Sequence, residues 1–389
     1  MNPYMLKRLW RRPWLSLCSL ILAAVLCFLM SYITGYIRQQ KQELEQMKDN
    51  FQILCVVTNR SGTRSTSLRM TPMEMSALTD DAAPLAPYME DLRLTKEFLG
   101  SGSALTLNKS DVLGVTNPRC HESLNPELGG DVTLWQEDFW EREDYVCLIS
   151  QEAAGTLRAQ QEDPAAPLDP NTVLKVMVED PYSTESAMVE LTVAGTYAGL
   201  GQALFLPFPA ASRLAAELSG RVTCDSAAFL ARDNQHLAEL AAAASGDFGT
   251  VDPSAGDGGT PRLALTIHDE VYRSTLATLE QNIRRGELTL PLLLLLCLAC
   301  GLLLGFLGTR NELRAYALMR TLGSTWQRML VSILLEQTLL PLLAFAVVAL
   351  VMKTPLQALP CLVFQIVGCC PPTMKAVRTP PTTILREQE

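Results

Sequence analysis

Long apolar runs at the two ends of the chain flank a mostly polar middle. Two runs carry no charged residue, a third contains only Glu336, and a shorter fourth contains Pro360. The first three are long enough to cross a hydrocarbon core of about 30 Å as helices. The pattern predicts a membrane protein with four transmembrane helices, one N-terminal and three C-terminal. The predicted spans are 13–36, 288–308, 329–351 and 354–370.

The polar middle, residues 37–287, is predicted to be an α+β domain on a helical stalk. The stalk segments are 37–50 and 270–287, which favour helix and run directly into predicted spans. Between them, short β-branched runs alternate with helix-like runs and with Pro- and Gly-rich loops. Predicted strands are 51–57, 144–150, 172–178, 187–197 and 227–231, and predicted helices are 151–161, 210–218 and 234–244.

Charge predicts the orientation in the membrane. The N-terminal segment 1–12 holds Lys7, Arg8, Arg11 and Arg12 without an acid, which favours a cytoplasmic N-terminus. Residues 38–287 contain 20 Lys and Arg against 37 Asp and Glu, a net charge of −17. We therefore expect an extracytoplasmic domain and a multi-pass protein of the cell membrane. The loop 309–328 and the tail 371–389 are then cytoplasmic. A cleaved signal peptide is disfavoured, because the first run is too long and no A-x-A-like site follows it.

Cysteine usage leaves disulfide formation open. Seven of the eleven cysteines lie in or beside apolar spans, where we expect small apolar packing residues. The other four permit two disulfides in three pairings, among which the sequence does not choose. These four are Cys55, Cys120, Cys147 and Cys224.

No catalytic constellation occurs in the sequence. The three histidines, His121, His236 and His268, have no metal-ligand spacing, and neither G-x-S-x-G nor H-E-x-x-H is present. A phosphate loop, G-x-x-x-x-G-K-[ST], is also absent. We therefore predict a non-enzymatic chain without a cofactor or metal of its own, to which another polypeptide supplies energy. The acidic domain argues against nucleic-acid binding.

The loop between the second and third spans predicts a short surface helix. Ala315, Leu318, Met319 and Leu322 share one helical face, and Gly323 suits the position after a helix end. Ser324 and Gln327 form a capping box that would start the third span at once. Such a stiff connection suits the receipt of force from a cytoplasmic partner. The charged residues beside the bilayer are Arg310, Glu312, Arg314, Arg320 and Arg328.

Two further features lie inside the predicted spans. Glu336 is an intramembrane carboxylate, which we interpret mainly as a structural partner of Arg328 or of an arginine in the short helix. A proton or substrate role for Glu336 is the alternative. Cys297, Gly301 and Gly305 repeat every four residues, a small-residue ridge that permits close helix approach and suggests a dimer contact.

The sequence RNELRAYALMRTLGSTWQRML resembles the FtsX/MacB-type ABC transporter permeases. Arg320, Leu322, Gly323 and Glu336 match the family pattern, whereas Leu313 stands where an acid is expected and Glu312 comes one residue early. The C-terminal PPTTILREQE resembles the closing family segment through Pro381, Leu385 and Arg386. In the domain, ELTVAGTY and ALFLPF resemble the strand pair of the family's core domain.

The resemblance implies a permease subunit that couples ATP hydrolysis by a separate ABC ATPase to extracytoplasmic export or mechanotransmission. ATP and magnesium would be bound by that ATPase, and a second permease would complete a homo- or heterodimer in the lipid membrane. The implied coupling residues are Arg310, Glu312, Arg314, Leu318, Met319, Arg320 and Gly323. The implied substrate is a peptide, a drug or a lipid. A membrane-anchored sensor without transport activity is the alternative hypothesis.

Overall fold

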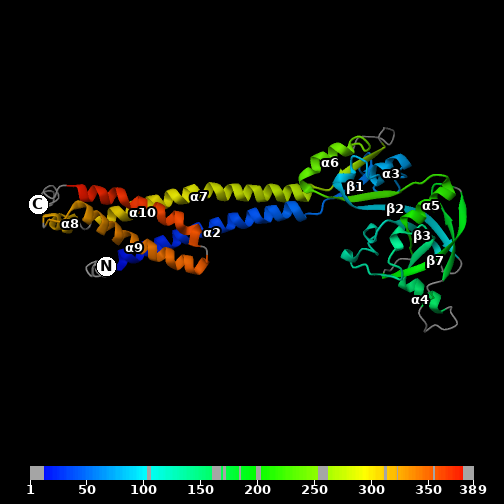
Figure 1. The fold of residues 1–389 in the computed structure, drawn as a ribbon, viewed down its shortest axis with the longest axis horizontal. Helices are drawn as coiled ribbons and strands as arrows, with labels where there is room; N and C mark the ends of the chain where they lie inside the picture. The colour runs from blue at the N-terminus through cyan, green and yellow to red at the C-terminus, as the bar shows by residue number, and fades with distance from the viewer. Residues whose placement is uncertain are drawn as a thin grey trace. The chain divides into compact units, whose positions relative to one another are not determined.

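The computed structural model in Figure 1 contains two compact units, a helical unit and a β domain. The helical unit comprises residues up to Met47 and from Ser274 onward, and the β domain comprises Lys48–Arg273. The structure describes residues 13–102, 107–159, 168–169, 172–183, 185–198, 203–252, 262–310, 313–321, 323–353 and 355–379.

The helical unit is built from long apolar helices. All of its helices except α8 are long and apolar enough to cross a membrane, which gives four candidate spans in the described residues. One of the four is N-terminal and three are C-terminal, so the predicted fold class is confirmed and the chain has the makeup of a multi-pass membrane protein. The helices are α2 (Pro13–Asn50), α7 (Glu270–Arg310), α8 (Leu313–Thr321), α9 (Trp326–Met352) and α10 (Pro355–Arg378).

The polar stalk segments are helical extensions of α2 and α7. Within the helical unit they pack against each other. Lys41 Nζ lies 2.7 Å from Glu287 Oε1, and Ile37 and Ile283 are buried. Gly286 permits this approach, because a Cβ at that position would lie 2.6 Å from Ile37 Cγ1. The exposed ion pair contributes at most about 1 kcal/mol, so the apolar contact holds the two segments together.

The fourth span continues beyond its predicted end at Cys370. The helix α10 runs through Pro371 and Pro372 to Arg378. Membrane helices tolerate proline where neighbouring helices accommodate it. Here Gly305 of α7 provides the space, because a Cβ at Gly305 would lie 2.8 Å from Pro372 Cγ. Pro372 therefore packs against α7 and Pro371 is exposed on the surface of α10, so neither proline ends the helix.

The β domain contains ten strands and four α-helices in its described residues. The strands are β1 (Leu54–Asn59), β2 (Met89–Gly102), β3 (Leu107–Val115), β4 (Val132–Leu134), β5 (Val146–Ser150), β6 (Val173–Glu179), β7 (Ser186–Tyr197), β8 (Leu204–Pro207), β9 (Ser226–Ala231) and β10 (Leu263–Ile267). The helices are α3 (Pro72–Thr79), α4 (Gln151–Ala159), α5 (Phe208–Ser219) and α6 (Leu237–Ala244). Short 3-10 helices lie at Ala86–Tyr88, Pro118–Cys120, Pro126–Leu128, Phe139–Glu141 and Asn234–His236.

The strands form two lobes that share β2. In the sheet lobe, the antiparallel order is β10-β1-β9-β2, with α3 and α6 beside β1 in Figure 1. In the ring lobe, the pairing runs β2-β3-β8-β5-β7-β6 and returns from β6 to β2. A core of buried aliphatic side chains joins the ring strands to α4 and α5. The predicted strands and helices are all present within a few residues, whereas β2, β3, β4, β10 and α3 were not predicted.

A buried ionic cluster lies where the two lobes meet. One edge of β2 pairs with β3. Along its other edge, β9 pairs with residues 89–95 and β6 pairs with residues 99–101. Between them, the Glu97 backbone N–H donates to Asp225 Oδ2 at 2.9 Å. Lys96 Nζ lies 3.1 Å from Asp225 Oδ2 and 3.7 Å from Asp180 Oδ1. Lys96 and Asp225 are fully buried, so each charge depends on the others.

The four cysteines of the β domain form no disulfide. All are free thiols, and Cys55, Cys147 and Cys224 are buried. Burial raises the pKa of each of these three thiols to about 12, so they remain protonated at neutral pH. These cysteines therefore act as small core residues, which answers the question that the sequence left open.

Replacing Lys96 with Ala is expected to destabilise the junction of the two lobes. The change leaves two buried carboxylates without their cation, which costs about 3–5 kcal/mol. Hydrogen-exchange protection of β2 amides in the full-length protein would measure this loss. The control is Lys175→Ala, which breaks an exposed pair with Glu190 and should cost less than about 1 kcal/mol. Equal protection in the two variants would contradict a stabilising role of the cluster.

Candidate functional site

The segment between α7 and α9 has the helix and glycine turn that the sequence predicts. The helix α8 ends at Thr321, and Gly323 follows with φ of +93°. The Ser324 N–H donates to the Met319 carbonyl at 3.2 Å, which is the backbone bond of a Schellman C-cap. Gly323 is needed here because a residue with a Cβ is strained at this φ. The predicted glycine stop is confirmed.

The start of α9 differs from the prediction. Its N-cap is Thr325, with φ of −69° and ψ of 143°, and no side-chain capping bond is present. Ser324 is therefore not the cap, and the predicted capping box with Gln327 is wrong. The Ser324 N–H is already used in the C-cap of α8, which places Ser324 in the turn itself. The connection is nevertheless short, because α9 begins at Trp326.

Packing fixes α8 onto the bundle through a residue that the sequence analysis missed. Tyr316 is buried, with 5% of its surface exposed, in a cluster with Met329 and Ile333 of α9 and Val377 of α10. Met319 packs at the edge of this cluster. Leu318, predicted to lie on the same face as Met319, is instead 56% exposed. The side chain of Leu318 is therefore exposed, whereas Tyr316 packs α8 against α9 and α10.

Three of the predicted coupling arginines lie at the end of α7 and within α8. Arg310 ends α7 and is exposed. Arg314 and Arg320 lie within α8, but their side chains fall outside the described part of the structure. Glu312 lies outside the described residues altogether. The proposed coupling role of these side chains stays a prediction.

Glu336 is half-buried in α9 and interacts with another group of the chain. Arg328, one predicted partner, has no ion pair with a carboxylate among the described residues. The neighbouring Gln337 connects helices, because its Oε1 accepts a 3.1 Å hydrogen bond from Thr373 of α10. Gln337 therefore links α9 to α10 beside Glu336.

The small-residue ridge of α7 packs against α10 of the same chain. A Cβ at Gly301 would collide with the Gln365 carbonyl oxygen, and one at Gly305 would lie 3.1 Å from the Cys369 Cα. Gly368 of α10 approaches the Leu298 carbonyl in the same way. The interpretation of this ridge as a dimer contact is therefore wrong, because α10 already occupies it.

Cys297, the first residue of this ridge along α7, belongs to a group of three thiols. Its Sγ is 3.2 Å from Cys361 of α10, and Cys361 is 3.8 Å from Cys27 of α2. All three are buried and reduced. Among the described residues, no group of His, Cys, Asp and Glu could hold a metal ion. The three thiols belong to an apolar cluster in which α2, α7 and α10 meet, so they act as the small packing groups that the sequence predicts for cysteines in spans.

Replacing Gly301 with Ala is expected to destabilise the helical unit. The added methyl group meets backbone atoms of Gln365, and overpacking of this kind costs about 1–3 kcal/mol. Gly35→Ala in α2 is the matched control, since its Cβ would meet only Gln357 Oε1, at 3.7 Å. Thermal unfolding in detergent, followed by size-exclusion chromatography, measures both. A melting temperature for Gly301→Ala equal to that of the control would contradict the close approach.

Comparison with known proteins gives likenesses of the β domain to solved structures. No family model and no curated protein matches the chain. The periplasmic region of MacB from Actinobacillus actinomycetemcomitans is similar at 11% identity, with a TM-score of 0.34, over 57% of this chain and 92% of that one. The extracellular domain of the noncanonic ABC-type transporter YknZ from Gram-positive bacteria is similar at 10% identity, with a TM-score of 0.34, over 55% and 99%.

Proposed function

We propose that this chain is the membrane subunit of an ABC transporter and that a separate ATPase docks on α8. The observation that carries the proposal is the geometry of α8. The helix is fastened to α9 and α10 by Tyr316, presents Leu318 to solvent, and passes into α9 through a capped glycine turn. A docked partner that moves α8 would therefore also move α9, because little slack separates the two helices.

Charge supports a cytoplasmic position for α8. The end of α7, the α8 segment and the end of α10 carry basic residues, and the first span is preceded by four more in residues 1–12. Basic residues concentrate on the cytoplasmic side of membrane proteins. The acidic β domain would then lie outside the cell and would receive the motion that the ATPase drives. The basic residues on the α8 side are Arg310, Arg314, Arg320, Arg328, Lys375 and Arg378.

The proposal includes partners that the chain does not contain. ATP and magnesium bind to the ATPase, and a second permease, identical or related, completes the transporter in the lipid bilayer. The small-residue ridge of α7 is occupied by α10, so the contact between permeases uses another surface of the helical unit. The β domain would then take part in the export of a peptide, drug or lipid or would transmit mechanical force to such a substrate.

Leu318→Asp is expected to weaken ATPase docking without disturbing the fold. Leu318 is 56% exposed, so the new carboxylate remains solvated in the free chain but is unfavourable in an apolar interface. Recovery of the ATPase with the tagged permease from native membranes should fall about tenfold or more, which corresponds to about 1.4 kcal/mol. Leu128→Asp, at another exposed leucine in the β domain, is the matched control. Unchanged recovery with Leu318→Asp would exclude α8 as the docking surface.

An insertion of four glycines after Gly323 is expected to separate docking from transmission. The ATPase should still co-purify, because α8 keeps its exposed face, but α9 would no longer follow α8. ATP-dependent changes in hydrogen exchange of the β domain should then disappear. The same insertion after Gly129, another positive-φ glycine with open space around it, is the control. Persistent ATP-dependent changes with the Gly323 insertion would refute transmission through this turn.

A further inference from the structure

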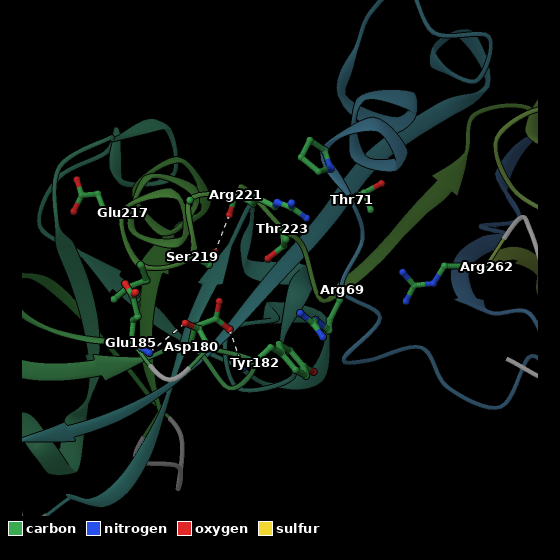
Figure 2. Close-up of a pocket in the computed structure, with 14 residues that line it drawn as sticks. Arg69, Thr71, Asp180, Tyr182, Glu185, Glu217, Ser219, Arg221, Thr223 and Arg262 are labelled. Carbon is green, nitrogen blue, oxygen red and sulfur yellow. Dashed lines mark hydrogen bonds between the residues drawn. The ribbon is translucent and has the colours of Figure 1, made fainter. Parts of the chain in front are cut away.

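An open pocket of about 930 Å³ lies in the β domain, between its two lobes (Figure 2). The sheet-lobe side contributes Arg69, Thr71 and Arg262, and the ring lobe contributes Asp180, Tyr182 and the segment from Glu217 to Arg221. Figure 2 shows Arg69, Arg221 and Arg262 on the same side of the pocket as Thr71 and Thr223. Glu185 and Glu217 lie on the opposite side. The two glutamates therefore lie apart from the arginines, and Asp180 lies between the two groups beside Tyr182.

The arginine side of the pocket holds unneutralised positive charge. Among the described residues, Arg69, Arg221 and Arg262 have no carboxylate within ion-pair distance. Two of the three lining acids, in contrast, already have partners in the protein. Asp180 faces buried Lys96. Glu217 accepts hydrogen bonds from Arg213 at 3.1 Å and Tyr145 at 2.7 Å. The charge left for a ligand is therefore mainly cationic, in a domain whose net charge is strongly negative.

Arg69 is held in place before any ligand arrives. Its φ is +53°, a left-handed conformation that costs a residue with a side chain about 1–3 kcal/mol. Backbone bonds on both sides maintain it, from Leu68 N to the Asp225 carbonyl at 2.9 Å and from Met70 N to the Cys224 carbonyl at 2.8 Å. Buried Leu68 and Met70 anchor this segment, so the exposed Arg69 side chain is directed away from the core.

The guanidinium of Arg69 is oriented by an aromatic ring. Its Cζ lies 4.4 Å from the ring centroid of Tyr182, within cation–π range. The Tyr182 backbone N–H donates to Asp180 Oδ1 at 3.2 Å, and Lys96 Nζ lies 5.8 Å from the Tyr182 ring. The buried cluster at the lobe junction therefore positions Tyr182, and Tyr182 positions Arg69. Preorganised donors of this kind lower the entropy cost of binding a ligand.

We propose that this pocket is a binding site for a multiply charged oxyanion, a phosphate ester or pyrophosphate group. Guanidinium groups bind phosphate oxygens through paired, charge-assisted hydrogen bonds, and three of them suit more than one negative charge. The acidity of the rest of the domain disfavours extended polyanions, so a compact anion is selected. Because the pocket is lined from both lobes, the anion would bridge them. The site is independent of ATPase docking and is testable on this chain alone.

The test is isothermal titration of inorganic pyrophosphate into the full-length chain in nanodiscs of neutral lipid. We expect saturable binding with a Kd below about 1 mM that weakens as the salt concentration rises. Arg69→Gln and Arg221→Gln should each weaken binding about tenfold or more, because each removes charge-assisted hydrogen bonds. Arg69→Lys and Arg221→Lys should retain part of the affinity, since the charge stays while the paired geometry is lost.

The control variant is Arg158→Gln, which removes an exposed arginine of α4 in the same domain that does not line the pocket. It should bind pyrophosphate within a factor of about two to three of the unmodified chain, the usual context dependence of such effects. Phosphatidic acid in the nanodiscs identifies the source of the group: competition with pyrophosphate indicates a lipid headgroup, and its absence indicates a soluble ligand. Absence of saturable binding, or binding equally strong in Arg69→Gln and Arg221→Gln, would overturn the proposal.

Discussion

Direct backbone contact between α7 and α10 is the constraint on which the helical unit depends. In a bilayer, apolar burial does not drive helices together, so association relies on close packing and hydrogen bonds. Gly301 and Gly368 let the two backbones touch, and Gly305 makes room for Pro372. Only because α10 continues past its prolines does Val377 reach the cluster that holds Tyr316. The position of α8 therefore depends on glycines of α7, the helix that precedes it in the chain.

In the β domain, the corresponding constraint is the shared strand β2. A strand edge without a strand partner needs other acceptors for its N–H groups. Asp225 supplies one for Glu97, and Lys96 balances the charge that this carboxylate brings into the core. The same arrangement places Asp180 beside Tyr182 in the pocket wall. The buried cluster that satisfies the Glu97 N–H of β2 therefore also forms part of the surface between the lobes.

Features that depend on local sequence could be predicted, and features that depend on distant contacts could not. The spans follow from composition, and Gly323 marks the end of α8 because a positive φ leaves few other residue types possible. The strand β2 was missed because Lys96 and Glu97 interrupt its apolar pattern, and the acids that neutralise Lys96 come from other parts of the chain. Pro371 and Pro372 suggested a helix end, but α10 continues because Gly305 of α7 leaves space for Pro372 and Pro371 is exposed. Helical periodicity grouped Leu318 with Met319, but α9 and α10 meet α8 on the side of Tyr316.

The capped turn at Gly323 has a mechanical consequence. With nine residues and a rise of about 1.5 Å per residue, α8 is a lever about 14 Å long whose pivot lies beside the start of α9. A tilt of about 20° at this pivot would displace the far end of the lever by about 5 Å, close to the pitch of one helical turn. The buried ring of Tyr316, between pivot and far end, would move about half as far, and with it the cluster that α9 and α10 share. A modest rotation of one short helix is therefore large enough to shift the packing of two spans.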